Sequence, residues 1–286
     1  MKKLRKVMAS AIAMMTFSTA AAVTGTVAWF TASNVVTATG MSIKADTEQG
    51  INISNESKTV WKESAEASHN GKIGENQAAF IPTSTYDGVH WYHANSEDRD
   101  SHEAFGGYTT LTYEQNGSSG VYAVTNQNLS ITDKNVYLLN KFYLRSSTPF
   151  VVNAPKLYVN SIAATAATSN STALNKSLRV LVSTTVSSTD YIKVFAPFET
   201  GNELKSYDVA TNAGSYTALN QQNVELVPTA LQIPAASDDT SAAALEIRVY
   251  VYFEGEDVNC KSANIPSEVL DTISLTCKFG TEILNA

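Results

Sequence analysis

Three of the four histidines, His90, His93 and His102, share one short segment with the carboxylates Glu97, Asp98, Asp100 and Glu103. Imidazole and carboxylate groups can bind zinc or a similar cation. However, the chain has no His-Glu-x-x-His motif, which would place two imidazoles on one face of a helix. On a strand, His90 and His93 would point to opposite sides of the sheet. We therefore expect the His90–His102 segment to be a solvated loop without a metal.

A second group of oxygen ligands lies in the run Glu254-Gly255-Glu256-Asp257-Val258-Asn259. Carboxylates in a turn can coordinate calcium. The run lacks the alternating Asp-x-Asp-x-Asp-Gly pattern of a calcium-binding loop. We therefore expect an exposed acidic turn at the end of a strand.

The chain has two cysteines, Cys260 and Cys277. An even number of cysteines in an exported chain favours a disulfide. This bridge would close a loop of about 17 residues and stabilise the fold by roughly 3 kcal/mol. The alternative is that Cys277, on the apolar face of a strand, is simply part of the core. Neither cysteine has a catalytic signature around it, so a thiol nucleophile is not expected.

The chain carries no Gly-x-Ser-x-Gly motif, phosphate-binding loop or dinucleotide fingerprint. We therefore predict that the protein is not an enzyme and needs no cofactor. Only 16% of its 286 residues are charged, against about 25% in an average soluble chain. The net charge is -7, which argues against binding to nucleic acid.

Apolar and polar residues alternate along most of the segments that would position the histidines, carboxylates and cysteines, as expected for β-strands. Leu245 to Phe253 alternates apolar residues with a second face that holds Glu246, Arg248, Tyr250, Tyr252 and Glu254. Similar patterns cover 136–144, 178–182 and 273–279. Helical signals are weak and limited to 61–69 and 266–270. The sequence therefore predicts an all-β fold, a single β-sandwich or jelly-roll-like domain over 40–286. Long polar loops are expected at 94–120, 160–176, 199–223 and 235–243.

Residues 1–28 have the pattern of a secretory signal peptide, expected as a helix. Lys2 to Lys6 is basic, the next segment is apolar, and Thr26-Val27-Ala28 is a small-residue cleavage site, so cleavage is expected between Ala28 and Trp29. The alternative is a retained membrane anchor, but the apolar run is shorter than the roughly 20 residues that span a bilayer. Cleavage removes four basic residues and no acidic one, which lowers the net charge from -7 to -11. We expect a secreted protein that touches a membrane only through the uncleaved signal.

The region around the cleavage site resembles the TasA/camelysin family of exported bacterial proteins. The resemblance rests on Gly25-Thr26-Val27-Ala28, on the pair Trp29-Phe30 and on 37–43, and covers roughly 20–55. Two further segments, 142–147 and 253–260, are similar to uncharacterised relatives with the same leader. The resemblance implies cleavage by a SipW-type signal peptidase. It also implies subunits of extracellular biofilm-matrix fibres, assembled by donor-strand insertion.

Residues 29–39 are β-prone and have no evident partner within the domain. An extended arm of this kind can add a strand to the sheet edge of another copy. We expect it to act as a donor strand in a head-to-tail homopolymer. By the resemblance, its anchors are Trp29, Phe30, Val35 and Val36. The alternative is that the arm pairs within its own domain or frays.

Two other functions stay open at this stage. The long loops and many tyrosines would suit a monomeric cell-surface adhesin that binds glycans. The camelysin resemblance also implies a metallopeptidase, which the missing helical zinc motif makes weaker.

Overall fold

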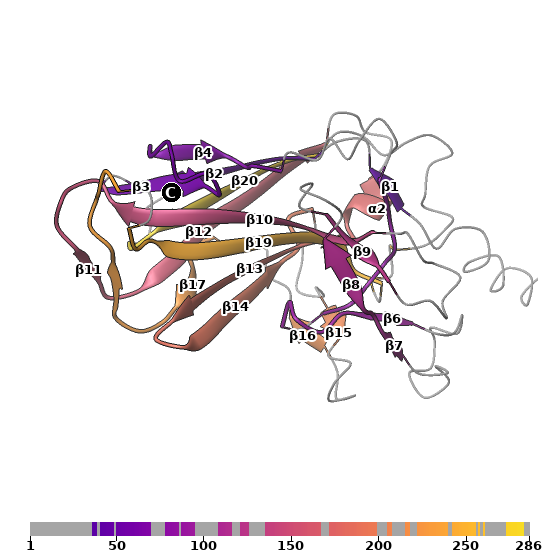
Figure 1. Cartoon of the computed structure of the whole chain (residues 1–286). Helices are drawn as coiled ribbons and strands as arrows, with labels where there is room; N and C mark the ends of the chain where they lie inside the picture. The colour runs from indigo at the N-terminus through magenta and orange to yellow at the C-terminus, as the bar shows by residue number, and fades with distance from the viewer. Residues whose placement is uncertain are drawn as a thin grey trace, which may run out of the picture.

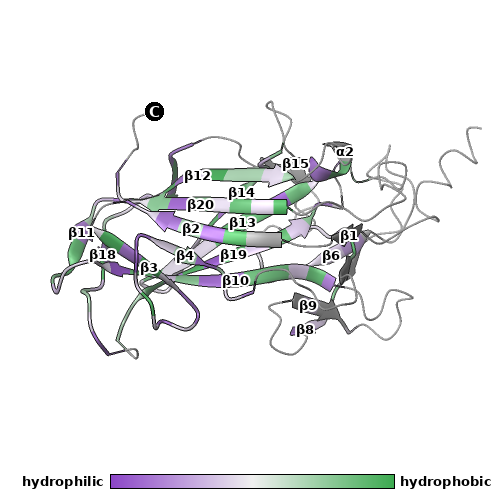
Figure 2. Ribbon diagram, turned by 90° about the horizontal axis from the view of Figure 1, so that it is seen from above, coloured by the Kyte–Doolittle hydropathy of each residue, from purple (hydrophilic) through white to green (hydrophobic). Residues whose placement is uncertain are grey.

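A computed structural model describes residues 36–38, 41–48, 50–69, 78–85, 87–94, 108–115, 121–125, 135–166, 172–198, 205–207, 215–217, 222–239, 242–255, 257, 260 and 273–282. The predicted all-β fold is confirmed: strands form two main sheets that stack as layers (Figures 1 and 2). The predicted signal helix lies outside the described residues. The one short helix is α2 (Thr172–Asn175), in the part of the chain that the structure describes.

The larger sheet has nine strands. Its main path runs β1 (Val36–Ala38), β5 (Ala78–Phe80), β10 (Asn135–Ser146), β19 (Leu245–Phe253), β13 (Leu178–Val186) and β14 (Thr189–Phe195). Three more strands extend it from β10: β3 (Ile51–Asn55), β9 (Val121–Val124) and, through β9, β8 (Tyr113–Gln115).

The smaller sheet has the strand order β17 (Val224–Val227), β12 (Leu157–Ala166), β20 (Ile273–Gly280), β2 (Met41–Thr47) and β4 (Ser64–Glu66). Three two-stranded ribbons complete the fold: β6 (Tyr92–Ala94) with β7 (Tyr108–Thr110), β11 (Val152–Ala154) with β18 (Leu231–Ile233), and β15 (Lys205–Tyr207) with β16 (Ser215–Thr217). Several sequence expectations are wrong here. The helical signal at 61–69 contains β4, and the expected loop at 160–176 begins with seven of the ten residues of β12. The expected loops at 94–120 and 199–223 contain the strands β7, β8, β15 and β16.

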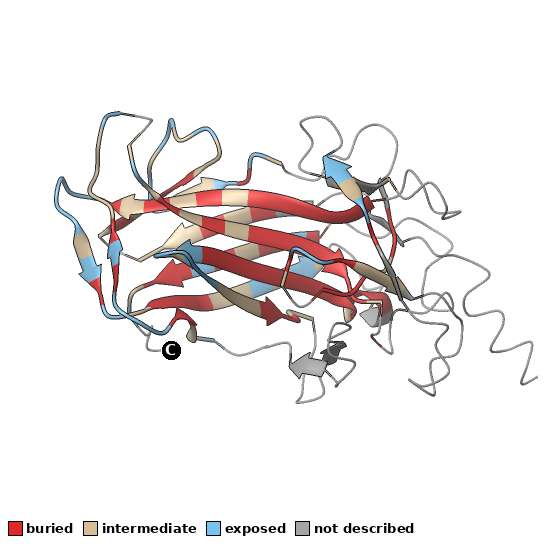
Figure 3. Cartoon of the chain, turned by 60° about the horizontal axis from the view of Figure 1, so that its bottom comes forward, coloured by how far each residue is buried: buried red, intermediate tan, exposed pale blue. Residues whose placement is uncertain are grey.

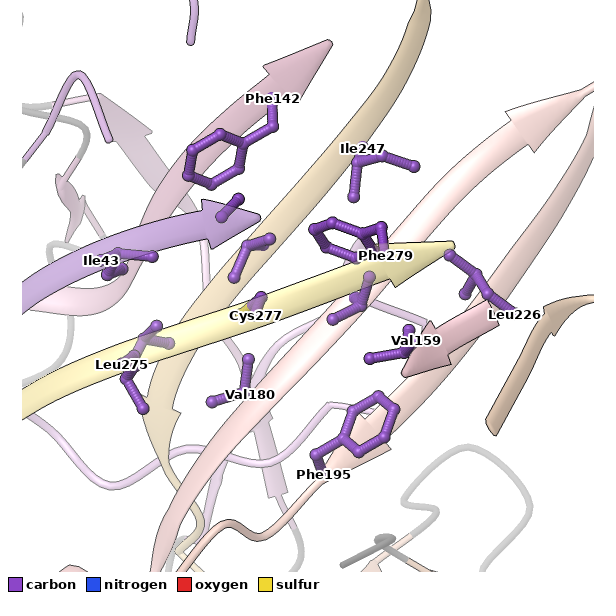
Figure 4. Packing of buried hydrophobic residues seen from close by; sticks show 14 of the residues in the cluster. Ile43, Phe142, Val159, Val180, Phe195, Leu226, Ile247, Leu275, Cys277 and Phe279 are labelled. Atoms are coloured by element: carbon purple, nitrogen blue, oxygen red, sulfur yellow. The ribbon is translucent and has the colours of Figure 1, made fainter. Parts of the chain in front are cut away.

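The main core lies between the two sheets, where the alternating apolar faces meet (Figure 4). Ile43, Leu275 and Phe279 come from the smaller sheet, and Phe142 and Ile247 come from the larger one; none is more than 1% exposed. The period-two pattern therefore located this core correctly, since strand residues two apart share a face.

The outer face of the larger sheet is also buried over part of its area. Trp91 is fully buried there, with its ring stacked 4.4 Å from Tyr137 and edge-on at 5.0 Å to Tyr252. Tyr250 and Tyr252, on the second face of the Leu245–Phe253 strand, are therefore buried as well. Figure 3 shows that the central strands are buried along most of their length.

Candidate assembly edge

The strand β1 contains the only predicted arm anchor that the structure describes, Val36. It pairs antiparallel with β5 of the same chain, with Val36 opposite Phe80, Thr37 opposite Ala79, and Ala38 opposite Ala78. The expectation that the arm has no partner within its own domain is thus wrong for these three residues. Trp29, Phe30, Val35 and the cleavage site between Ala28 and Trp29 lie outside the described residues.

The position of β1 makes it an edge strand. Within the described part of the chain it pairs with β5 alone, and it stands at the start of the larger sheet. The next strand, β2, begins at Met41 and belongs to the smaller sheet. The chain therefore crosses from one sheet to the other just after Ala38. Figures 1 and 2 place β1 at one end of the sandwich, far from the β11–β18 ribbon.

The partner strand β5 is held in place by contacts that do not involve β1. The backbone N–H of Ile81 donates to the carbonyl of Asn135 at 2.9 Å, and that of Thr83 donates to the carbonyl of Phe253 at 2.9 Å. The side chain of Phe80 is fully buried, with its ring centroid 6.3 Å from that of Phe253. Strand β5 would thus keep its position if β1 left.

The acidic turn after β19 supplies the rest of this support. Glu254 is fully buried and Asp257 is 8% exposed, so the expected exposed acidic turn is wrong. Asp257 forms an ion pair with the fully buried Arg179 of β13. Glu254 accepts a hydrogen bond from the hydroxyl of Ser84, in the segment that continues β5. The two carboxylates thus join β13, β19 and the β5 segment, and the described residues give no calcium site.

Electrostatics keep Arg179 charged. Burial on its own lowers the pKa of this guanidinium, but the charges of Asp257 and Glu254 raise it, and the net result is a raised pKa. A buried ion pair tolerates its desolvation only when opposite charge and hydrogen bonds compensate it. Arg179 is not among the residues expected from the sequence, although a lone arginine within the apolar run from Leu178 to Val182 is a signal for it.

The histidine segment is only partly described, since His102 lies outside the described residues. His90 is exposed, and its Nδ1 lies 2.6 Å from the carboxylate of Asp87. His93 is partly buried, with Nδ1 at 3.0 Å from the carbonyl of Pro82, and burial lowers its pKa. The two histidines thus have separate partners. The described residues contain no group of three potential metal-ligating side chains.

The predicted disulfide is absent, since Cys260 and Cys277 are both thiols. Cys277 is fully buried in the main core, which is the alternative that the sequence left open. Cys260 is half-buried and packs against the same cluster. Burial, with a smaller effect from the charge of Asp46, raises the pKa of the Cys277 thiol to about 12. This thiol is therefore unreactive in the folded protein.

No family model matches the chain, and no curated protein or solved structure matches it either. Among the described residues, no helix has both the length and the apolar character needed to cross a membrane.

Proposed function

We propose that the protein is an exported structural subunit that assembles head to tail into an extracellular fibre. In this proposal, β1 of one copy leaves its own β5 and pairs with β5 of the next copy. The observation that carries the proposal is the position of β1, a three-residue edge strand whose partner is anchored independently.

Strand exchange conserves the backbone pairing of β1 with β5. A donated β1 can form the same ladder as the strand it replaces, so the exchange loses no backbone hydrogen bonds at equilibrium. A contact between two different surfaces, the arm and the β5 edge, does not close on itself and therefore propagates. In this proposal the segment before β1, which includes the aromatic pair Trp29-Phe30, anchors the donated strand on the receiving copy.

The resemblance of residues 20–55 to the TasA/camelysin family supports the same function. It implies export, cleavage by a SipW-type signal peptidase before Trp29 and incorporation into a biofilm matrix or surface fibre. Cleavage would create the N-terminus that assembly requires. No described feature favours the metallopeptidase alternative.

The first experiment compares the mature chain, residues 29–286, with a form that begins at residue 40. Negative-stain microscopy and sedimentation velocity at high concentration should show fibres of the longer form and single folded particles of the shorter one. Fibres of normal length from the shorter form, or no assembly by the longer one, would refute the proposal. Single particles would leave the monomeric glycan-binding adhesin as the better alternative.

A second experiment tests which strand is exchanged. Thr37 and Ala79 are opposite each other in the β1–β5 ladder. The double variant Thr37→Cys/Ala79→Cys should stay monomeric when oxidised, because the disulfide would lock β1 in its own sheet, and should assemble again when reduced.

Mixing the two single variants provides the complementary measurement. A disulfide between Thr37→Cys of one copy and Ala79→Cys of another can form only if β1 moves between copies. Thr37→Cys mixed with Lys278→Cys, a position exposed on the other sheet, is the matched control and should give no cross-link. Fibres without the first cross-link would show that assembly uses another edge.

A further inference from the structure

Strand β10 has an opening along one edge of the larger sheet. On one side it pairs with β19 over Leu138–Leu144. On the other side β9 pairs with it at Asn135 and Tyr137, and β3 pairs with it only from Phe142 onward. Within the described residues, 138–141 therefore have no strand neighbour on that side. Figure 1 shows β9 and β3 at different points along β10.

The main chain of His69 lies across this opening. Its N–H donates to Oδ1 of Asn140 at 3.0 Å, and its carbonyl accepts from Nδ2 of Asn140 at 3.1 Å. The buried amide of Asn140 thus satisfies both backbone polar groups of His69 in the gap between β9 and β3. The ring of His69 is fixed in turn, because its Nε2 lies 2.9 Å from Oε2 of Glu56.

These contacts leave a cavity of about 250 Å³ beside the opening. This volume corresponds to about eight water molecules. It is lined by groups that can donate or accept hydrogen bonds, and its apolar part comes from Leu139; the polar lining is Glu56, His69, Gln115, Tyr122, Lys141 and Tyr143. Tyr143 is held in place by a 3.0 Å hydrogen bond to Glu246 and by Lys58, 4.0 Å from its ring centroid.

Lys141 is the lysine among the lining residues. Its ammonium has no hydrogen bond and no ion pair with any described residue, whereas the nearby carboxylate of Glu56 is engaged by His69. Lys141 is partly buried, and an ammonium with no partner among the described residues favours an anionic ligand group, since a charge-assisted hydrogen bond is stronger than a neutral one. Two tyrosines and several polar groups around one small space suit a hydroxylated ring.

We propose that this cavity binds a single acidic sugar residue, a hexuronate, with its carboxylate on Lys141 and its hydroxyl groups on His69, Glu56 and Gln115. The site combines strands β8, β9 and β10 with Glu56 and His69, which follow β3 and β4 along the chain. It lies within one copy of the chain, so the proposal does not depend on assembly into fibres.

The test is isothermal titration of the mature protein with sodium glucuronate, glucose and sodium acetate. We expect glucuronate to bind measurably and both glucose and acetate to bind at least about tenfold more weakly. Glucose lacks the carboxylate, and acetate lacks the hydroxylated ring. Glucose binding as tightly as glucuronate would refute the role of the charge. Acetate binding as tightly would refute recognition of the sugar ring.

Lys141→Gln should weaken glucuronate binding about ten- to a hundredfold, the effect expected for a lost hydrogen bond between charged groups. The matched control is Lys278→Gln on the outer face of the other sheet, which should bind like the wild-type protein. Thermal unfolding of both variants checks that they fold. Equal affinity of Lys141→Gln and Lys278→Gln for glucuronate would refute the proposed site, as would a lack of glucuronate binding by the wild-type protein.

Discussion

At the scale of single residues, the turn after β19 shows that the partners of a carboxylate decide whether it is exposed or buried. Glu254 and Asp257 seemed suited to solvent or calcium, but both are buried beside Arg179. We predict that Arg179→Met lowers the free energy of unfolding by about 3–5 kcal/mol, since it leaves buried carboxylates without their cation. Urea denaturation of the mature protein provides the measurement.

The control for Arg179 is Arg248→Met on the neighbouring strand β19. The Arg248 side chain is 26% exposed and lies 3.4 Å from Asp190 and 3.8 Å from Glu246. Asp190 and Glu246 are 61% and 41% exposed. Ion pairs that reach solvent contribute about 1 kcal/mol or less, so this variant should be nearly as stable as the wild-type protein. Equal losses in the two variants would contradict the proposed role of Arg179.

The buried thiol of Cys277 leads to a prediction about pH. Its pKa is raised from 9.0 to about 12 in the folded chain. As the pH rises, the Cys277 thiol therefore loses its proton in the unfolded chain before it does so in the folded chain. The stability that this thiol contributes is fully present below pH 9 and decreases between pH 9 and pH 12. Between pH 8 and 10.5 the loss is about 2 kcal/mol.

Urea denaturation at pH 8 and pH 10.5 checks this contribution. The stability of the wild-type protein relative to Cys277→Ala should fall by about that amount, although tyrosines destabilise both proteins at high pH. A thiol titration in denaturant should also count two thiols per chain. A count of zero would show that the disulfide exists after all.

At the scale of elements, the turn between β13 and β14 has a sequence that does not suit its conformation. Ser187 and Ser188 both have positive φ, 49° and 64°, where glycine and asparagine are favoured. Ser187→Asn/Ser188→Gly should therefore raise the free energy of unfolding by about 1–2 kcal/mol, measured by urea denaturation. The control Ser274→Gly, at an exposed position of β20, should lower it. A loss of stability in the turn variant would contradict this explanation.

At the scale of the whole molecule, the two ends of the described chain are joined. Strand β2 pairs in parallel with β20, from Met41 opposite Ile273 to Thr47 opposite Phe279. Just beyond β2, the Glu48 carboxylate accepts a hydrogen bond from the N–H of Thr281 at 2.6 Å. Asn160 of β12 donates to the carbonyl of Glu282 at 2.8 Å. This closure joins segments distant in sequence, and such non-local contacts slow folding.

Gly280 lies at the centre of this closure, which gives a prediction. A Cβ atom at this position would overlap the side-chain oxygens of Asn160 and Glu48. Gly280→Ala should therefore lower the free energy of unfolding by about 1–3 kcal/mol, the usual cost of overpacking. Lys278→Ala, at an exposed position on the same strand, should change it by no more than about 0.5 kcal/mol. Similar unfolding midpoints for the two variants would contradict the prediction.

The sequence by itself determined the class of the fold and the inward faces of β10, β13, β19 and β20. These follow from local alternation, since a strand places every second residue on one side. Only the tertiary structure decided that Tyr252 and Glu254 are buried, that Val36 pairs with Phe80, and that His69 fills the gap beside β10. Each of these depends on a segment distant in sequence, and local periodicity carries no information about which distant segments meet.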